Sequence, residues 1–254
     1  ITSGRSGHIA GGVWCAVRDA QTTFLYCGDV VPASPIFAMD APPTCDAVAL
    51  DASYGDDDVA GSERAAQVRT WIAAQPAGCV LPTPLYGRSA ELLAIIRSPI
   101  ALAPGMREAL SAQVAASRWL VDGVAEMLAA RLHAAEDWRF GMALPHAALI
   151  CHDGMGMSGP STRILEMADA QRHPTLFTGH VPANTQGERM LAAGRAAWIR
   201  LPTHPTRAEN VALATASGAR IVLGHSCDPD ALARLAGYLP SLRTDAATGV
   251  TIEI

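Results

Sequence analysis

The chain has 254 residues; half of them are apolar, 17% are charged, and the formal net charge is −5. This length is sufficient for one large or two small domains with a buried core. The negative charge argues against broad electrostatic binding of nucleic acid but not against a local arginine groove. No apolar stretch approaches the roughly 20 residues of a membrane span, so we expect a soluble, cytoplasmic protein without a membrane segment.

The six cysteines are scattered along the chain without C-x-x-C spacing. This pattern predicts reduced, mostly buried thiols rather than a disulfide framework or a thiolate zinc site. The sequence starts at Ile1 instead of Met, and no signal peptide is visible. We therefore expect that it begins inside a longer chain.

Residues 1–31 alternate turns and strands. The alternation in VWCAVR and the β-rich segment TTFLY, around a turn at residues 20–21, predict a hairpin. His8 precedes this hairpin in a glycine-flanked loop, and Asp29 follows it directly after a glycine. A further apolar strand in CDAVALDASYG ends on Asp51. Taken singly, each aspartate is equally well interpreted as a turn or cap residue.

A different pattern begins near residue 56. Residues 62–75 predict a capped helix, and short apolar strands then alternate with helices up to about residue 194. One of these helical regions is long and alanine-rich, from Met106 to about Ala135. The alternation predicts a parallel sheet covered by helices on both faces.

Two loops in this middle region have the composition of phosphate-binding turns. Residues 152–161 (HDGMGMSGPS) and 178–187 (TGHVPANTQG) each lead into a helix. Glycines let backbone N–H groups approach an anion, hydroxyl groups add donors, and a helix N-terminus favours negative charge. Neither loop matches the established nucleotide-binding motifs, and a plain strand-to-helix turn is an equally good interpretation of either one.

The last part of the chain predicts a strand near Arg200, an exposed His204, a helix over residues 207–217 and a buried strand over residues 219–223. The second strand is followed by His225. Open α/β sheets bind ligands beyond the carboxyl ends of their strands, so the two histidines are expected to lie close together. A hydrogen-bonded histidine near a turn is the alternative for each.

Taken together, these segments resemble the β-CASP branch of the metallo-β-lactamase superfamily, which includes ribonuclease J and the pre-mRNA 3′-end endonucleases. The similarity is carried by short motifs in the family's order: SGHIAGG, LYCGD, VALDASYG, LPTHP and IVLGHS. Between the third and fourth of these, LPTPLYGRSAELL, DGMGMSGPS and TGHVPANTQGERML resemble segments of the inserted cap domain.

The resemblance implies an α/β fold: the C-terminal half of a metallo-β-lactamase αββα sandwich with an inserted, parallel-sheet β-CASP cap. Residues 1–55 and 195–254 would form the metallo-β-lactamase part, and residues 56–194 the cap. It further implies a zinc-dependent ribonuclease that hydrolyses RNA phosphodiesters as an exo- or endonuclease. RNA is the expected partner, and homodimerisation is left open.

The resemblance also assigns roles to residues. His8 and His225 would each bind one of two zinc ions and Asp29 would bind both, because imidazole and carboxylate groups suit zinc. Asp51 and His204 would form the pair that protonates or stabilises the leaving oxygen. The residues expected to bind RNA phosphates are Ser158, Ser161, Thr185 and Arg189.

One defining motif of the superfamily, H-x-H-x-D-H, is absent. Either the chain lacks the preceding half of the metallo-β-lactamase domain, or it is an inactive pseudonuclease that binds RNA or protein without metal. With these ligands missing, we expect the chain to be inactive when isolated. A serine hydrolase centred on Ser226 is excluded, because Asp228 replaces the glycine of G-x-S-x-G and no histidine follows.

Overall fold

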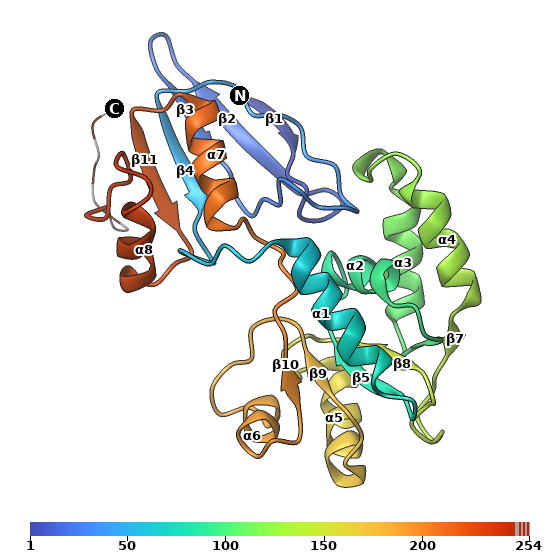
Figure 1. Cartoon of the computed structure of the whole chain (residues 1–254). Coiled ribbons are helices and arrows are strands. Elements are labelled where there is room, and N and C mark those ends of the chain that lie inside the picture. Colours follow the sequence, from blue (N-terminus) through green and yellow to red (C-terminus); the bar gives the residue numbers. More distant parts are fainter. Residues whose placement is uncertain (247–248, 250, 252, 254) are drawn as a thin grey trace. The chain divides into compact units, whose positions relative to one another are not determined.

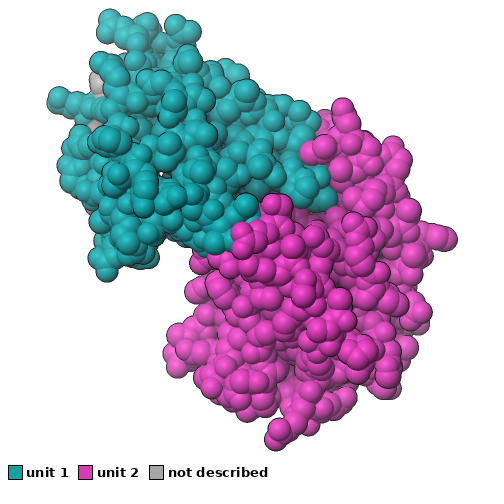
Figure 2. Space-filling model, viewed as in Figure 1, with its two compact units in different colours: residues 1–60, 203–254 teal, residues 61–202 magenta. Residues whose placement is uncertain are grey.

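The computed structural model describes residues 1–246, 249, 251 and 253, and shows a mixed α/β protein. Two compact units are present: unit 1 consists of residues 1–60 and 203–254, and unit 2 of residues 61–202 (Figure 2). The boundaries thus fall a few residues later than the expected ones near 55 and 194. Within the described residues, no helix has the length and apolar character needed to cross a membrane.

Unit 1 contains a five-stranded sheet with the order β1-β2-β3-β4-β11 (Figure 1). Its strands are β1 (Thr2–Arg5), β2 (Val13–Arg18), β3 (Thr23–Tyr26), β4 (Ala47–Asp51) and β11 (Ile221–His225). The predicted hairpin is confirmed, since β2 and β3 pair antiparallel. Strands β3, β4 and β11 are mutually parallel, so their carboxyl ends share one edge of the sheet.

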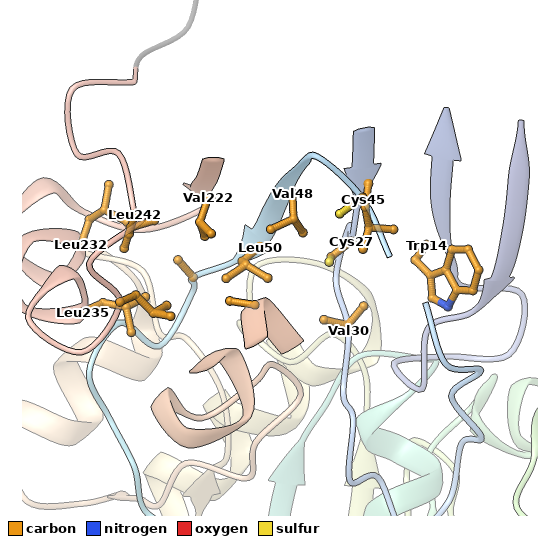
Figure 3. Close-up of a cluster of buried hydrophobic side chains, with 14 of the residues drawn as sticks. Trp14, Cys27, Val30, Cys45, Val48, Leu50, Val222, Leu232, Leu235 and Leu242 are labelled. Carbon is orange, nitrogen blue, oxygen red and sulfur yellow. The ribbon is translucent and has the colours of Figure 1, made fainter. Parts of the chain in front are cut away.

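One face of this sheet carries the core of unit 1. The alternate residues Val48 and Leu50 point to this face and are fully buried (Figure 3). They pack with apolar side chains of α7 (Arg207–Ser217) and α8 (Pro229–Ala236), of which Leu235 is fully buried. The bounds of α7 agree with the predicted helix, and Thr206 and Glu209 form its capping box.

On β2 and β3 the opposite face of the sheet is also apolar but is much less covered, whereas its residues on β4, Ala47 and Ala49, are buried. Residues that alternate with the core positions point to it, and Val13, Val17 and Tyr26 are 42%, 47% and 47% exposed. Phe24 and Leu223, on the same face, are partly buried. Burial of apolar surface is the main stabilising term in folding, so an exposed apolar sheet face is typical of a surface that another element covers.

Unit 2 is built around a parallel sheet with the order β5-β8-β6-β7. Its strands are β5 (Cys79–Pro82), β6 (Ile100–Leu102), β7 (Glu136–Asp137) and β8 (Ala148–Cys151). A parallel pair, β9 (Leu176–Phe177) and β10 (Ala197–Trp198), lies beside β5 through a bridge between Thr175 and Val80. The helices of this unit are α1 (Gly61–Ala73), α2 (Arg88–Ile95), α3 (Met106–Ala115), α4 (Val124–Ala134), α5 (Gly159–Gln171) and α6 (Gln186–Ala192).

Two predicted elements have other bounds in the structure than the sequence indicated. The long helical region over residues 106–135 contains α3, a short 3₁₀ helix and α4, and Gly123 adopts a left-handed conformation directly before α4. The strand expected near Arg200 lies slightly earlier: β10 ends at Trp198, and the N–H groups of Ile199 and Leu201 continue its hydrogen bonding to Phe177 and Thr178. Pro202 and Pro205 have no N–H to donate, so a strand ladder cannot continue through them.

Candidate metal centre

The carboxyl-terminal edge of the unit 1 sheet brings together residues from distant parts of the chain. Asp29 follows β3, Asp51 ends β4, and His225 ends β11 directly opposite Asp51 in the strand register. This edge is where open α/β sheets place their ligand sites. Topology therefore places three predicted site residues at one location.

His8 enters the same location from the loop after β1. Its Nδ1 hydrogen-bonds the backbone carbonyl of Thr203 at 2.8 Å, an arrangement in which a neutral ring carries its proton on Nδ1. The unprotonated Nε2 then lies 3.7 Å from Oδ2 of Asp29. Two electron-rich atoms facing each other in this way are suited to hold a cation between them.

Asp51 and His204 form a hydrogen-bonded pair, as the resemblance implied. His204 Nδ1 lies 2.7 Å from Oδ2 of Asp51, whose side chain is fully buried. Oδ1 of Asp51 accepts from both the backbone N–H and the hydroxyl of Ser53. The side chain of His204, predicted to be exposed, is only 22% exposed, because its ring packs against Tyr54 and His8.

The electrostatic balance at this pair favours an ionised Asp51. Burial alone raises the pKa of its carboxyl group. The hydrogen bond and charge of His204, together with the two hydrogen bonds from Ser53, outweigh burial and hold the pKa below its ordinary value. For His8, burial and the neighbouring His204 lower the pKa, which favours the neutral ring that a metal ligand requires.

Asp29, Asp51 and His204 form a group that could hold a metal ion, because one ligand atom of each lies within 4.8 Å of the others. Ligand atoms lie about 2.0–2.2 Å from a tetrahedral zinc ion, so two of them are about 3.4 Å apart. The separation of 3.7 Å between Nε2 of His8 and Oδ2 of Asp29 is close to this value. The group contains Asp51 and His204, which the sequence assigned to proton transfer and not to metal binding. His8 lies next to it, with ring centroids of His8 and His204 5.4 Å apart.

His225 occupies a different surrounding from the one expected of a ligand. Its Nδ1 hydrogen-bonds the hydroxyl of Ser226 at 3.0 Å, and its Nε2 is buried without a partner among the described residues. Its ring lies 5.2 Å from that of Tyr26, which is half-exposed on the same face of the sheet. A buried, unpartnered Nε2 is available for an additional ligand.

The sequence analysis overlooked three neighbours of this centre: Ser53, Tyr54 and Tyr26. The tyrosine hydroxyl of residue 54 accepts a hydrogen bond from the backbone N–H of Thr203, at 3.0 Å, and so fixes the loop that carries His204. A possible signal was present, since Ser53 and Tyr54 lie in the same short motif as Asp51. Residue spacing does not reveal the contacts of Tyr54 with Thr203 and His204, because they join segments about 150 residues apart.

In unit 2, the first predicted phosphate loop is occupied by one of its own carboxylates. Asp153 accepts hydrogen bonds from the Met157 N–H at 3.0 Å, the Ser158 hydroxyl at 2.9 Å and the Ser161 hydroxyl at 3.3 Å. Ser161 is fully buried. The donors that were predicted to bind an RNA phosphate therefore already bind an anionic group within the chain.

The second predicted phosphate loop is organised as a helix cap. Thr185 accepts from the N–H of Glu188 at 3.2 Å, and the carboxylate of Glu188 accepts from the N–H of Asn184. Arg189 is exposed and reaches the carbonyl of Asn184 at 3.4 Å. Thr185 therefore serves as the helix cap. Arg189, the only charged residue among the four predicted phosphate ligands, has an exposed side chain.

Two further hydroxyls at the carboxyl-terminal edge of the unit 2 sheet escaped the sequence analysis. Thr83 follows β5 and Thr178 follows β9; both are buried, and neither hydroxyl has a hydrogen-bond partner among the described residues. Their position just past apolar strands was the available signal. Buried hydroxyls normally find a partner, so this edge can accept an additional polar ligand.

No protein-family model matches the chain, and no curated protein matches it. In structure the chain is similar to a protein from Enterococcus faecalis V583, known from a crystal structure and described as of unknown function, with a TM-score of 0.51 and 8% sequence identity. The matched region covers 87% of this chain and 56% of that one, so the chain spans just over half the length of that protein. The likeness concerns the fold. Fold and site together define a mixed α/β protein with a side-chain group that could hold a metal ion.

Proposed function

We propose that the chain is part of a β-CASP ribonuclease of the metallo-β-lactamase superfamily, which hydrolyses RNA phosphodiesters with the help of zinc. The observation that carries the proposal is the arrangement of His8 and Asp29, in which an unprotonated Nε2 faces a carboxylate oxygen at 3.7 Å. The adjacent Asp51–His204 pair supports it, because it lies at the same sheet edge.

In the proposed site, His8 and Asp29 hold zinc, with His225 contributing through its buried and unpartnered Nε2. Zinc, when bound, supplies a nucleophile from water at neutral pH and neutralises charge on the phosphoryl oxygens. Thr203 keeps His8 in the required tautomer through its carbonyl, which is the usual arrangement behind a zinc-binding histidine.

Asp51 and His204 are proposed to handle the proton of the leaving oxygen. Asp51 is fully buried and ionised, so it orients the His204 ring through Nδ1 and stabilises its positively charged form. The Nε2 of His204 is then free to donate a proton to the oxygen that leaves phosphorus. This division of roles follows the general logic of a histidine oriented by a buried carboxylate.

The proposed ligand set within the chain is too small for two catalytic zinc ions, which usually have three protein ligands each. We propose that a further segment of the complete protein, carrying H-x-H-x-D-H, supplies the remaining ligands. The apolar sheet face that includes Val13, Val17 and Tyr26 supports this proposal, since it offers a surface on which such a segment can pack. In unit 2, Arg189 and the unpartnered hydroxyls of Thr83 and Thr178 are proposed to contact RNA phosphates.

The metal site is tested by zinc titration of the isolated chain in competition with a chromophoric chelator. His8→Ala and Asp29→Asn should each weaken zinc binding roughly tenfold or more, because each removes one ligand. His133→Ala is the matched control, since this histidine is exposed on α4 of unit 2 and belongs to no group of candidate ligands in unit 1. Zinc binding that is equal in the wild type and in Asp29→Asn would refute the site.

Ribonuclease activity is tested on the chain extended by its upstream coding segment, with 5′-labelled single-stranded RNA. Asp29→Asn and His204→Ala should abolish cleavage, while the His204 variant should retain most zinc affinity if its role is proton transfer. Zinc loss in His204→Ala would instead assign His204 to the metal, in agreement with the group formed by Asp29, Asp51 and His204.

A second function is favoured by the first loop of unit 2. Because Asp153 occupies the donors of Ser158 and Ser161, this loop does not present them to a phosphate. An inactive relative that uses unit 2 for binding RNA or protein would account for this feature. It predicts no RNA cleavage by the extended protein, even when zinc is bound.

A further inference from the structure

The amino-terminal edge of the unit 2 sheet contains a pocket that the metal centre does not use. It lies between the turn before β6 and the last turns of α4, and its volume is about 420 Å³. We call it the Arg97 pocket after one of its two arginines; the other is Arg131, and Ser98 also belongs to the lining. A volume of this size is at the lower end of the range for small-molecule sites.

The two arginines bring uncompensated positive charge into the pocket. Arg97 is exposed and Arg131 is partly buried, and neither forms an ion pair within the part of the chain that the structure describes. Burial and the charge of Arg97 lower the pKa of Arg131, which indicates that the two guanidinium groups repel each other. An anion between them removes this repulsion.

Arg131 is positioned for such a ligand by its contact with the chain. Its Nε donates to the carbonyl of Leu93 near the end of α2. Its terminal nitrogens have no partner among the described residues, so they remain available. Arg131 is not needed to cap α4, because Arg107 bonds the carbonyls of Leu132 and Ala135 at 2.7 and 2.6 Å.

Ser98 provides an independent indication of a ligand. Its hydroxyl oxygen is buried and has no hydrogen-bond partner among the described residues, although Ser98 lines the pocket. A buried hydroxyl without a partner costs free energy, and an anion in the pocket would accept a hydrogen bond from it. Two guanidinium groups and one hydroxyl are a donor set that matches a phosphate group.

The rest of the lining is small and apolar. Pro99, Ala130 and Ala134 form part of the wall beside the arginines. An inorganic phosphate ion would fill only a fraction of about 420 Å³ and would leave this wall in contact with water. The lining therefore fits a phosphate joined to an apolar or planar group better than it fits phosphate by itself.

We propose that the Arg97 pocket binds a small organic phosphate, with the phosphate against Arg97, Arg131 and Ser98 and the organic group against Ala130 and Ala134. The pocket lies at the opposite edge of the sheet from the loops that follow β5, β8 and β9, about 10 Å away for a strand of three residues. It is therefore separate from the proposed RNA contacts, and it does not depend on the metal centre of unit 1.

The proposal is tested by two-dimensional NMR titration of the chain with AMP, inorganic phosphate and adenosine in parallel. AMP should shift the amide signals of Ser98, Ala130 and Ala134, with a weaker response to phosphate and none to adenosine. Arg97→Gln should weaken AMP binding roughly tenfold, the value expected for the loss of one charge-assisted contact. Arg139→Gln is the control for net charge, because Arg139 is an exposed arginine of the same unit outside the pocket lining.

Ala130→Leu keeps both arginines and tests the apolar wall. It should weaken AMP binding while leaving the response to inorganic phosphate largely unchanged. The proposal is overturned if AMP shifts no signal of the pocket, if it affects only the residues around Ser158 and Ser161, or if Arg97→Gln and Arg139→Gln reduce binding equally. Displacement of AMP by single-stranded RNA at these same signals would also overturn it, in favour of an RNA contact.

Discussion

Asp51→Asn separates the structural role of Asp51 from its role at the metal centre. Both carboxylate oxygens accept hydrogen bonds: Oδ2 from His204 and the Val30 N–H, and Oδ1 from Ser53. An asparagine has only one acceptor oxygen. In either orientation its NH₂ group faces a backbone N–H donor, so the substitution breaks contacts despite its equal size.

The expected cost is large because the side chain of Asp51 is fully buried. Loss of about two hydrogen bonds to a charged group, each worth about 1.5–3 kcal/mol, predicts a destabilisation of about 3–5 kcal/mol at pH 7. Asp29→Asn is the matched control, since the side chain of Asp29 is 50% exposed. Its substitution should change the free energy of unfolding by less than about 0.5 kcal/mol.

The dependence on pH follows from the lowered pKa of Asp51. A carboxylate with a depressed folded-state pKa contributes stability that is fully present above the unfolded pKa of about 3.9. This contribution is lost as the pH falls through the folded-state value. The difference in stability between the wild type and Asp51→Asn should therefore be largest near neutral pH and should shrink in acid.

The assay is urea unfolding of the metal-free chain, followed by hydrogen exchange of peptides from β4, which reports on unit 1 separately from unit 2. Zinc titration completes the comparison, because both variants alter the centre but only Asp51→Asn should lose stability. If Asp51→Asn unfolds within 1 kcal/mol of the wild type at pH 7, the buried hydrogen-bond network is not as described.

Two further predictions concern a packed glycine and the buried thiols. Gly4→Ala should destabilise unit 1 by about 1–3 kcal/mol in thermal unfolding, because an added Cβ would lie 2.2 Å from the Trp14 ring. Gly61→Ala is the control and should be neutral, because its added Cβ would have nothing within 4 Å; equal effects of the two substitutions would contradict the packing. Burial raises the pKa of the Cys27 and Cys79 thiols to about 12, which disfavours the reactive thiolate. In the folded chain at most the two partly buried thiols, Cys15 and Cys227, should therefore react with Ellman's reagent, whereas all six cysteines should react in denaturant.

Much of the fold follows from local pattern. The hairpin of β2 and β3, the strand ending at Asp51 and helix α7 were predictable, because alternation, apolar runs and the capping residues Thr206 and Glu209 act within a few residues. The breaks within the helical region 106–135 and the end of β10 before Arg200 were not predicted, although Gly123 and Pro202 are visible in the sequence. Glycine and proline weaken an element locally, but tertiary context decides where the element ends.

The sequence by itself determined which residue types stand at strand ends, and so identified His8, Asp29, Asp51, His204 and His225 as candidates. The resemblance already implied the pair of Asp51 with His204. Only the tertiary structure decided that His8 contacts both Thr203 and Asp29. It also showed that Asp153 binds the hydroxyls of Ser158 and Ser161. The physical reason is that these hydrogen bonds and the burial depend on distances between segments that lie up to about 195 residues apart in the sequence. The parallel order of β3, β4 and β11 fixes these distances, whereas residue spacing does not.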